Sequence, residues 1–434
     1  MISTVRLGEI TEFINGGPWN ESEYVESGIP VVRVSDFTEN TVSLAKCKFL
    51  SRESWNKYSK HRLLAGDLVV ATVGSHPTQP ASVVGRPVII PQSAEGALLN
   101  QNAVCIRPKG GSIDKTYLGY LGCSKSFRDY IVAHARGAAN QARMSIALLK
   151  EMRVPLPSLT AQRKIAAILS GYDNLIGNNQ QRIRILNEII LAIYREWFTR
   201  FNFHGLESST VDSPLGQIPE GWGVSTFAEL FSGERNIVLT GPFGSKLHAS
   251  DYRPHGVPLI LVKHVKDGHI EEQNLPLVGS HKTVELDRYR LRTGDIIVTR
   301  VGFVGESAYV HHYYNDWLFS GQMLRVRLPT NGRLHARYLS QYYLTPAFKK
   351  SIQGHAVGTT RPSLNTDILM SMPILVPPYH VQSAFVEFVS PIDEMIQQLH
   401  RKNSNLVQIR DLLLSRLITD EASELDISEG STVI

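Results

Sequence analysis

Residues 63–74 read LLAGDLVVATVG, and residues 291–302 repeat the pattern as LRTGDIIVTRVG. In both segments a Gly-Asp turn precedes a run of apolar and β-branched residues, which predicts a strand. The two segments lie 228 residues apart (294 − 66), whereas solenoid repeats have periods of roughly 20–50 residues. The chain is therefore predicted to contain two copies of a whole domain.

Further matches extend this duplication in both directions. Gly28-Ile29-Pro30 recurs as Gly256-Val257-Pro258 at the same separation, and downstream the separation becomes slightly shorter. The downstream matches are Gln101 with Gln322, Tyr117-Leu118 with Tyr338-Leu339, Phe127 with Phe348, and Gly137 with Gly358. Each copy ends with a proline followed by a glutamine, at 157–162 and at 378–382, and a long helical stretch comes next.

Composition places the chain among ordinary globular proteins. Of its 434 residues, 42% are hydrophobic and 20% are charged, and this length indicates about two to four domains. The sequence has no apolar run of about 18 residues, so no membrane span is expected. The first residues form no apolar signal segment, which predicts a cytoplasmic protein. Cys47, Cys105 and Cys123 are scattered and lack metal-binding spacing.

Charge is distributed unevenly along the sequence. Residues 1–160 contain 18 Lys and Arg against 13 Asp and Glu, whereas residues 381–434 contain 4 against 9. The formal net charge of +5 therefore belongs to the two large copies and the first helical stretch, while the tail is acidic. A modest basic excess is compatible with phosphate contacts, although an ordinary solvated surface has the same composition.

Each copy is predicted to mix strands and helices. Strands are expected at 29–34, 68–73 and 103–107 in the first copy and at 259–262, 296–301 and 324–328 in the second. Residues 117–134 and 338–355 have apolar and aromatic residues at helical spacing. The sequence shows neither a regular alternation of strands and helices nor a GxGxxG motif. The predicted fold class is therefore α+β.

Two amphipathic stretches, residues 161–198 and 381–417, are predicted to be long helices. Positions 392, 395, 399, 402, 406, 409 and 413 alternate steps of three and four, which predicts a coiled-coil seam, and the matching positions of the first stretch are 172, 175, 179, 182, 186, 189 and 193. Asn179, Arg182 and Lys402 are polar exceptions on this seam that would fix the register. A helix of about 40 residues is about 60 Å long. The two helices are therefore expected to pack against each other as an antiparallel coiled coil.

These patterns together predict the organisation of the chain. The polar connection after the first helix contains Gly and Ser-Pro, and the last residues are acidic and rich in Ser. The predicted parts are a first globular domain at 1–158, a spacer helix at 159–202, a linker at 203–219, a second globular domain at 220–378, a second spacer helix at 379–419 and an acidic tail at 420–434.

Motifs for catalysis are absent from the sequence. No Gly-Lys pair occurs, which excludes a Walker-type NTPase loop. Residues 376–379 (VPPY) are close to the Asp/Asn-Pro-Pro-Tyr/Phe element of amino-methyltransferases, but Val376 cannot accept a hydrogen bond from a target amine. His311-His312 has no partner at metal-ligand spacing. We therefore expect no catalysis by this chain.

Polar and basic residues point instead to contacts with nucleic acid. Strand-to-loop exits lie at 72–76 and 299–302, and a second matched loop lies at 137–143 and 358–363. Polar side chains on such exits suit the reading of base edges, and Lys and Arg suit phosphates. The candidate DNA-binding residues are Arg33, Lys57, Lys60, Thr72, Ser75, His76, Asn140, Gln141, Arg143, Lys246, Lys263, His264, Thr299, Arg300, Thr360 and Arg361. For any one of them, an ordinary turn or surface residue is the competing interpretation.

The order of these motifs resembles the specificity subunit of type I restriction-modification systems over essentially the whole chain. The phrase Ile218-Pro219-Glu220-Gly221-Trp222 is similar to the start of a recognition domain in that family. Three further features also match this family: the duplicated Gly-Asp strand, the Gly-x-x-x-x-Ser/Thr loop and the Pro-to-Gln step before each helix. The first copy lacks the Pro-Glu-Gly-Trp phrase and has Gly137-Ala138-Ala139 where the family has a more polar loop.

This resemblance implies two target-recognition domains that read the halves of a bipartite, asymmetric site in double-stranded DNA. The two copies are expected to read different bases, because Asn140-Gln141 aligns with Arg361-Pro362. The paired helices would set the spacer between the halves. The resemblance also implies partners, namely two modification (methyltransferase) subunits that bind S-adenosylmethionine and restriction (motor-nuclease) subunits that use ATP and Mg. No cofactor is expected on this chain, and the modification subunits would dock on helix faces that include Arg182 and Lys402.

Two other classes of function remain open from the residues alone. One is a stand-alone DNA-modifying enzyme, against which the missing catalytic motifs argue. The other is a protein-interaction scaffold with two globular arms on a coiled coil. Binding of S-adenosylmethionine by the isolated chain would identify the first, and failure to bind DNA with a methyltransferase partner would favour the second.

Overall fold

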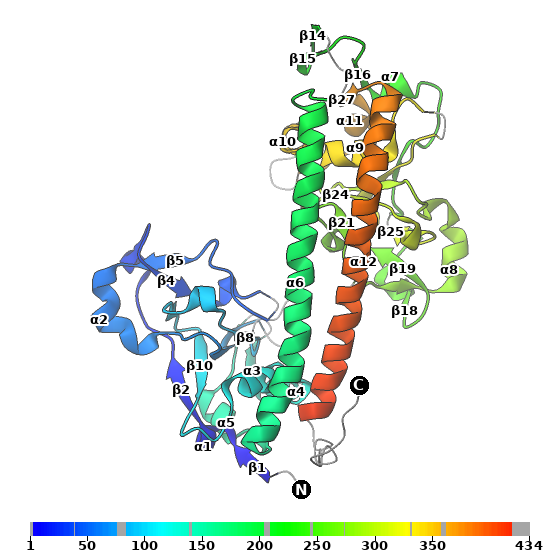
Figure 1. The fold of residues 1–434 in the computed structure, drawn as a ribbon. Helices are drawn as coiled ribbons and strands as arrows, with labels where there is room; N and C mark the ends of the chain where they lie inside the picture. The colour runs from blue at the N-terminus through cyan, green and yellow to red at the C-terminus, as the bar shows by residue number, and fades with distance from the viewer. Residues whose placement is uncertain are drawn as a thin grey trace, which may run out of the picture. The chain divides into compact units, whose positions relative to one another are not determined.

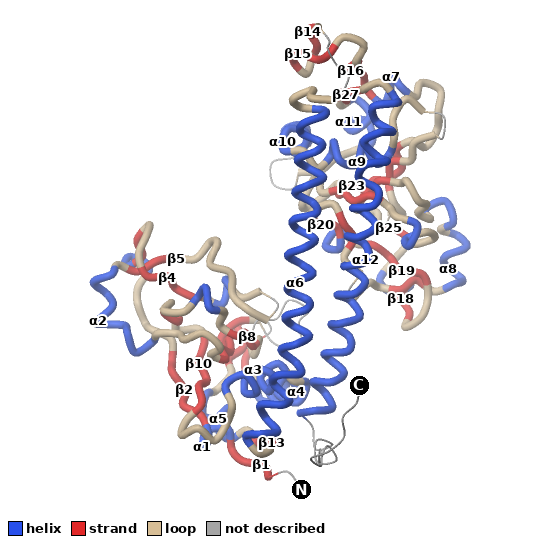
Figure 2. The backbone as a smooth tube through the Cα atoms, viewed as in Figure 1, coloured by secondary structure: helices blue, strands red, loops and turns tan. Residues whose placement is uncertain are grey.

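The computed structural model describes residues 3–38, 40–75, 84–138, 141–203, 209–243, 246–272, 274–329, 332–356 and 362–418. The chain divides into two compact units, residues 1–178 with 405–434 and residues 179–404. Each unit holds one globular α+β domain together with parts of two long helices (Figures 1 and 2). The predicted fold class is confirmed.

The first globular domain is built on two sheets. The central antiparallel sheet has the order β2 (Thr11–Asn15), β10 (Ala103–Pro108), β6 (Leu68–Ala71), β8 (Pro87–Ile89). The outer sheet has the order β3 (Tyr24–Val25), β5 (Lys48–Leu50), β4 (Ile29–Val32), β9 (Leu98–Leu99), in which β4 and β9 are parallel. In addition β1 (Ser3–Arg6) pairs with β13 (Arg153–Leu156) just before the first long helix begins.

The helices of the first domain are α1 (Leu7–Ile10), α2 (Trp55–Tyr58), α3 (Lys115–Cys123), α4 (Lys125–His134) and α5 (Ile146–Glu151). Side-chain caps define where α3 and α4 begin. The Asp114 carboxylate accepts from the N–H groups of Thr116 and Tyr117, and the Ser124 hydroxyl accepts from Phe127 N–H. These caps satisfy backbone donors that a helix start leaves without partners.

The second globular domain repeats the two four-stranded sheets of the first. Its central sheet has the order β17 (Val238–Thr240), β26 (Met323–Val326), β23 (Ile296–Thr299), β24 (Ser307–Tyr309), and its outer sheet has the order β18 (Tyr252–Arg253), β22 (Leu277–Val278), β19 (Val257–Ile260), β25 (Leu318–Phe319). Shorter pairs are β16 (Gly223–Thr226) with β27 (Pro373–Val376) and β20 (Val265–Lys266) with β21 (His269–Ile270). The helices are α7 (Phe227–Leu230), α8 (Ser280–Glu285), α9 (Ala336–Tyr343), α10 (Pro346–His355) and α11 (Thr366–Ser371). The predicted domain duplication is confirmed.

The strands that follow the two Gly-Asp turns are buried on both faces. In β6, Leu68 and Val70 face a core formed with the helices, while Val69 and Ala71 face a second core shared with the outer sheet. In β23 the same alternation places Ile296 and Ile297 in two different cores. A strand covered on both sides needs an unbroken apolar run, which is why these segments dominate the sequence pattern.

The aspartates of the Gly-Asp turns hold each domain together. Asp67 Oδ2 accepts from Leu64 N–H at 2.7 Å and pairs with Arg107 at 2.6 Å, while its Oδ1 lies 2.9 Å from Lys115 Nζ. Burial would raise the pKa of Asp67, but hydrogen bonds from these partners outweigh it and hold the pKa below its usual value. The preceding Gly66 has a φ of +79°, a conformation that favours glycine.

The second domain has the same arrangement around Asp295. Its Oδ2 accepts from Arg292 N–H at 2.8 Å, and its Oδ1 lies 2.6 Å from Arg327 Nε. The duplicated Gly-Asp element therefore belongs to the fold, because it ties a turn to a neighbouring strand in both copies.

The Pro-to-Gln step joins each domain to its long helix. Gln162 is fully buried, and its Oε1 accepts from Asp114 N–H at 2.7 Å while its Nε2 donates to Ser112 O and Pro157 O. Gln382 makes the corresponding bonds to His335 N–H, Arg333 O and Pro377 O. Three hydrogen bonds from one amide thus fix the start of each long helix against its own domain.

The long helices α6 (Leu159–Phe198) and α12 (Tyr379–Ile418) each contain 40 residues. They run antiparallel, because in the second unit Asn179 bonds Asn403 while Tyr194 packs on Phe385. In the first unit Arg410 NH1 donates to Asp173 Oδ1 at 2.7 Å. The predicted antiparallel pairing is confirmed.

The predicted seam was only partly right. Residues Ile176, Ile183, Ile190 and Ile396 are buried, whereas Leu175, Arg182, Ile189, Met395, Lys402 and Ile409, which were assigned to the seam, are exposed. Both helices have apolar residues at adjacent positions, such as Met395 and Ile396, so periodicity alone could not choose between neighbouring stripes. Of the predicted polar exceptions, Asn179 lies in the interface and bonds Asn403 at 2.9 Å, while Arg182 and Lys402 do not lie there.

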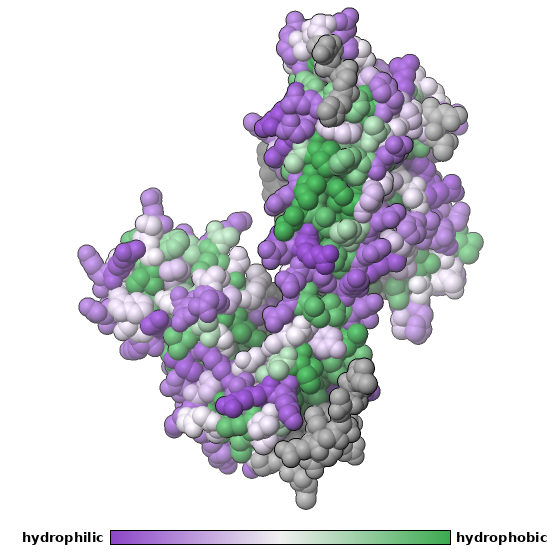
Figure 3. Space-filling view, viewed as in Figure 1, coloured by the Kyte–Doolittle hydropathy of each residue, from purple (hydrophilic) through white to green (hydrophobic). Residues whose placement is uncertain are grey.

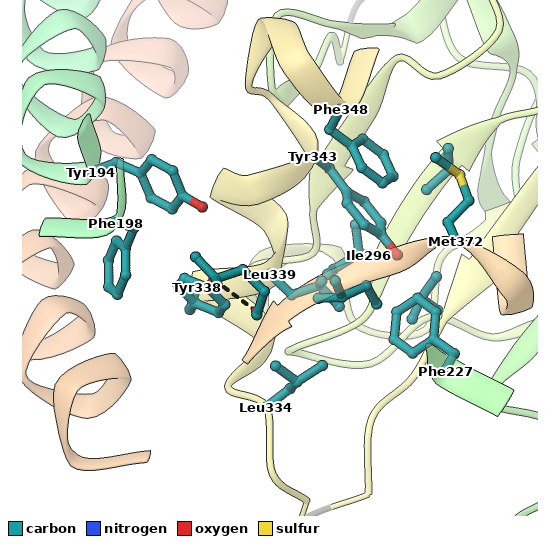
Figure 4. Close-up of a cluster of buried hydrophobic side chains, with 14 of the residues drawn as sticks. Tyr194, Phe198, Phe227, Ile296, Leu334, Tyr338, Leu339, Tyr343, Phe348 and Met372 are labelled. Atoms are coloured by element: carbon teal, nitrogen blue, oxygen red, sulfur yellow. Dashed lines mark hydrogen bonds between the residues drawn. The ribbon is translucent and has the colours of Figure 1, made fainter. Parts of the chain in front are cut away.

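Aromatic side chains join the second domain to the helices (Figure 4). Tyr194 and Phe198 of α6 lie against Tyr338 of α9, with ring centroids 6.0 and 4.7 Å from it, and Phe198 lies 5.2 Å from Phe385 of α12. Tyr338 is fully buried, and its hydroxyl donates to Leu375 O at 3.0 Å. Large buried rings with a satisfied hydroxyl supply much of the apolar area of this core.

The remaining connections are short. Residues in the predicted linker form a hairpin of β14 (Thr210–Ser213) and β15 (Gly216–Pro219). The predicted acidic tail, 420–434, lies outside the described residues. Within the described ranges, no helix combines the length and the apolar character needed to cross a membrane.

Candidate nucleic-acid interface

The two loops that the sequence singled out come together in each domain. In the first domain β7 (Val73–Gly74) pairs with β12 (Gln141–Arg143), which pairs with β11 (Arg136–Ala138), forming a three-stranded ribbon. In the second domain Val301 forms an antiparallel bridge with Ser363, and Leu364 N–H donates to Arg300 O at 2.8 Å. Segments far apart in the sequence therefore share one surface in both copies.

Thr72 holds the ribbon of the first domain in place. Its N–H donates to Asn102 O at 2.8 Å, its carbonyl accepts from Met144 N–H at 2.9 Å, and its side chain is buried. Ser75, which directly follows β7, is half-buried, and Arg143 is exposed. His76 and Asn140 lie outside the described residues, while Gln141 pairs through its backbone with Ala138.

Arg136 also lies on this surface, but it was not among the DNA-binding residues predicted from the sequence. It is exposed and lies directly opposite Arg143 on the neighbouring strand. Among the residues that the structure describes, neither guanidinium forms an ion pair. The sequence shows an arginine at each end of the segment 136–143, but only the strand register shows that the two arginines face each other.

The matching surface of the second domain is built around Arg300. Its Nε donates to Leu364 O at 2.9 Å, and its guanidinium lies 5.1 Å from the centroid of the Phe243 ring, a cation–π contact. Phe243 is 53% exposed and Phe303 is 78% exposed. Neither phenylalanine was predicted from the sequence, because residue type and spacing do not show that these two rings are exposed.

Thr299 acts inside this loop. Its side chain is fully buried, and its hydroxyl donates to the carbonyls of Phe303 and Glu306. Gly302 and Gly305 have φ values of +84° and +89°, which permit the tight turn between them. Thr299 therefore shapes the turn that presents Arg300 and Phe303. Thr360 and Arg361 lie outside the described residues.

The basic residues near the outer sheet of the first domain differ in how accessible they are to a ligand. Arg33 is engaged with Asp36, through Nε at 3.1 Å and NH2 at 2.9 Å, and these hydrogen bonds raise its pKa. Lys57 Nζ lies 3.1 Å from Glu23 Oε2 and remains exposed. Lys60 is exposed as well. Lys57 and Lys60 are accessible to a ligand, although Lys57 also contacts Glu23, whereas Arg33 is partly buried against Asp36.

In the second domain Lys246 and Lys263 are exposed, and His264 is buried. His264 Nδ1 accepts from Leu261 N–H at 3.1 Å, which closes the turn before it. Burial lowers the pKa of His264 to about 4, with a smaller contribution from Lys263. At neutral pH this imidazole is therefore neutral and serves the turn.

A polar cavity of about 140 Å³ lies between the second domain and α12. Arg337 crosses it, donating from NH2 to Asp393 Oδ1 at 2.8 Å. Burial lowers the pKa of His311, which lines the same cavity, to about 4. Over the described ranges, no cluster of three or more His, Cys, Asp or Glu residues could hold a metal ion. The residues around this cavity thus belong to the interface between the second domain and α12.

The two surfaces present different chemistry from the same scaffold. The first offers two opposed arginines on a ribbon, and the second offers one arginine with two exposed phenylalanines. Arginine contacts phosphates or guanine edges, while phenylalanine contacts thymine methyl groups or the faces of bases. Two such surfaces are able to read two different stretches of nucleic acid.

Comparison with known proteins gives consistent results. A family model for the type I restriction modification DNA specificity domain matches residues 2–188 and 278–408. A putative type I restriction enzyme MjaX specificity subunit of Methanocaldococcus jannaschii is 24% identical over 415 residues, covering 95% of this chain and 92% of the relative. The EcoBI specificity subunit of Escherichia coli is 20% identical over 438 residues, covering 97% and 85%.

One solved structure shares the fold at low identity. The crystal structure of the type I restriction-modification S subunit from M. genitalium aligns with a TM-score of 0.54 and 16% identity, covering 97% of this chain and 96% of that chain.

Proposed function

Because the chain belongs to the type I restriction modification DNA specificity family, we propose that it is the non-catalytic subunit that selects the DNA target of a type I restriction-modification enzyme. The observation that carries this proposal is the meeting of two matched loops on one surface in each of two duplicated domains. Each surface would read one half of a bipartite site. Because the surfaces differ in their exposed residues, the two halves would differ in sequence.

The candidate residues take different roles in this proposal. Arg143 and Arg300 would contact DNA directly, together with Ser75 and with His76, Asn140, Gln141, Thr360 and Arg361. Thr72, Thr299 and His264 are buried and would act by holding the loops and turns in shape. The accessible lysines Lys57, Lys60, Lys246 and Lys263 would supply phosphate contacts, and Arg33 would position a turn through Asp36.

The helices α6 and α12 would set the spacing between the two half-sites. Each passes from one unit into the other without interruption. A continuous α-helix rises about 1.5 Å per residue and is stiff over this length. The number of unspecified base pairs would therefore be fixed by the number of helical residues.

The family assembles with modification and restriction subunits, and the exposed faces of α6 and α12 offer sites for the former. Ile168, Leu175 and Ile409 are exposed in the first unit, and their counterparts in the repeat, Phe388, Met395 and Ile189, are exposed in the second. Figure 3 shows hydrophobic surface over these helices in the second unit. Exposed apolar residues repeated in this way mark an interaction surface. They support two equivalent docking sites and hence two modification subunits.

Cofactors are assigned to the partners by the same proposal. S-adenosylmethionine would bind to the modification subunits, and ATP and Mg would bind to the restriction subunits. The isolated chain is therefore expected to bind none of them.

A gel shift with a mixed-sequence duplex tests this function against its alternatives. We expect DNA binding by the full chain assembled with its modification subunits, and no binding of labelled S-adenosylmethionine by the chain alone. Tight binding of S-adenosylmethionine to the isolated chain would favour a stand-alone enzyme. A complex that forms with the methyltransferase partner but does not shift DNA would favour a protein scaffold.

A further inference from the structure

We propose that Arg136 and Arg143 together form a clamp for one DNA backbone phosphate in the first recognition domain. This inference rests on the proposed function and adds to it a specific, sequence-independent contact in one of the two copies. It is carried by the juxtaposition of the two side chains, for which the described residues supply no carboxylate partner.

The first step is the geometry of the ribbon. Arg136 in β11 and Arg143 in β12 are direct partners in an antiparallel pair. Directly opposed residues project from the same face of a sheet, with Cβ atoms about 4.5–5.5 Å apart. The residue that alternates with Arg143, Ala142, is fully buried. The arginines therefore share the outer face of the ribbon, which is exposed.

The second step is the unfavourable charge of this pair. Like charges directly opposite each other destabilise a strand pair. No described carboxylate lies within ion-pair distance of either guanidinium. The C-terminus of α4, at His134, offers only a fractional negative charge to Arg136. An anion bound between the two side chains would relieve this repulsion.

A second pair of opposed arginines in the same domain provides an internal comparison. Arg6 in β1 lies directly opposite Arg153 in β13. There, Arg6 Nε lies 3.3 Å from Glu151 Oε2, so the chain supplies its own counter-charge. The Arg136–Arg143 pair is the one for which the described structure provides no such carboxylate.

The third step identifies the anion as a phosphate. The edges of bases carry only partial charges, whereas each backbone phosphate carries a full negative charge that can accept from both guanidinium groups. Arg143 also lies opposite Val73 of β7, so a phosphate held here would lie close to Ser75, one of the residues proposed to contact DNA. Phosphate contacts of this kind fix the register of a protein on the duplex.

The clamp belongs to the first copy alone. The matching positions in the second copy are Val357, by sequence, and Ser363, which bridges Val301 as Arg143 pairs with Val73, and neither has a charge. The second domain therefore obtains its phosphate contacts from other residues. Loss of the clamp should weaken binding without changing which bases either domain prefers.

The test compares Arg136→Ala, Arg143→Ala and the double variant in the full chain assembled with modification subunits. The probes are a duplex selected by the wild-type complex from a random library and a mixed-sequence duplex of the same length. The slope of log affinity against log salt concentration should become shallower by about 0.9 for each phosphate that the variant no longer binds. Affinity should fall by the same factor on both duplexes, and the penalty for base changes in each half-site should not change.

Two further variants separate binding from folding. Arg136→Glu should raise the thermal midpoint of the free chain, because it places opposite charges across the ribbon, yet it should weaken DNA binding more than Arg136→Ala. Arg153→Ala, in the neutralised pair, should leave the salt slope unchanged.

Several outcomes would overturn the clamp. One is an unchanged salt slope in the double variant. Another is a selective loss of discrimination at one base pair, which would make the arginines base readers. In either case the wild-type complex still selects a sequence, so the proposed function survives. If the wild-type complex selected no sequence at all, the proposed function itself would fail.

Discussion

At the scale of single residues, buried carboxylates and amides do most of the structural work in the repeated motifs. Asp67 is completely buried yet charged, because it closes a turn and pairs with Arg107 and Lys115 at once. Asp295 repeats the turn and the arginine pair in the second domain. Replacing such a group leaves its partners without a counter-charge, which costs more than the pair itself contributes.

We expect Asp67→Asn to lower the free energy of unfolding of the first unit by about 3 kcal/mol, because Arg107 and Lys115 lose their shared carboxylate. Urea unfolding at neutral pH measures this change. Asp129→Asn is the matched control, since Asp129 forms an exposed pair with Lys125 at 3.5 Å, and it should change stability by less than about 0.5 kcal/mol.

The same carboxylate predicts a dependence on pH. The pKa of Asp67 is lower in the folded protein than its usual value, which is about 3.9 in the unfolded chain. The stabilisation is therefore fully present above about pH 4 and is lost as the pH falls through the folded pKa. The stability difference between wild type and Asp67→Asn should shrink below about pH 4. A difference that stayed constant down to about pH 2 would contradict this assignment.

Arg300 provides a further prediction at this scale. Arg300→Ala removes the cation–π contact with Phe243 and the guanidinium offered to DNA. Loss of one base-reading arginine costs about 1–3 kcal/mol of discrimination. Binding to duplexes altered in one half-site at a time should show the loss in one half only. Equal losses for both halves would argue against separate readers.

Prediction from sequence was least successful at the level of the individual site residue. Thr299 was predicted as a polar residue at a strand end and His264 as one of a cluster of basic residues, but turn geometry directs both side chains inward. Arg136 was missed because its importance comes from the strand register, which pairs it with Arg143. Neither property can be read from residue type and spacing.

At the scale of elements, the long helices were located well and their faces less well. The predicted spans of 161–198 and 381–417 agree closely with α6 and α12. Part of the predicted seam was misplaced by one residue, because Met395 and Ile396 are both apolar and only the packing decides which is buried. The outer apolar stripe that this leaves exposed is the surface proposed for the modification subunits.

Adjacent residues of α12 test this division of roles. Ile396 is 4% exposed and Met395 is 44% exposed. Ile396→Ala should destabilise the second unit by about 2–4 kcal/mol, because it leaves a cavity in the core. Met395→Ala should change stability by less than about 0.5 kcal/mol.

Met395→Ala should nevertheless weaken assembly with the modification subunit, measured by sedimentation of the complex. An effect on stability alone, with assembly unchanged, would show that the exposed stripe is not the docking surface. The two residues thus serve as controls for each other.

At the scale of the whole molecule, duplication was the property best predicted from sequence. Matched Gly-Asp turns and matched Pro-to-Gln steps predicted the repeat of a complete domain, and the two four-stranded sheets have the same strand order in both domains. The pairing of the two matched loops in each copy was not predicted, because it depends on contacts between segments far apart in the sequence.

The helices α6 and α12 connect the two recognition domains, so their length should control the spacing between the two half-sites in DNA. Insertion of four residues after Arg182, about one helical turn, should change the length of the unspecified spacer in the preferred target. Selection of bound duplexes by the variant complex measures this. The half-site sequences themselves should remain those of the wild type, and an unchanged spacer would refute the role of the helices.

The assignment of two separate readers is best tested by selecting bound sequences from random duplexes with the full chain assembled with its modification subunits. Two domains with different loop chemistry predict two short specified segments of different sequence, separated by an unspecified spacer of constant length. A single contiguous motif, two identical half-sites, or no enrichment would contradict this assignment.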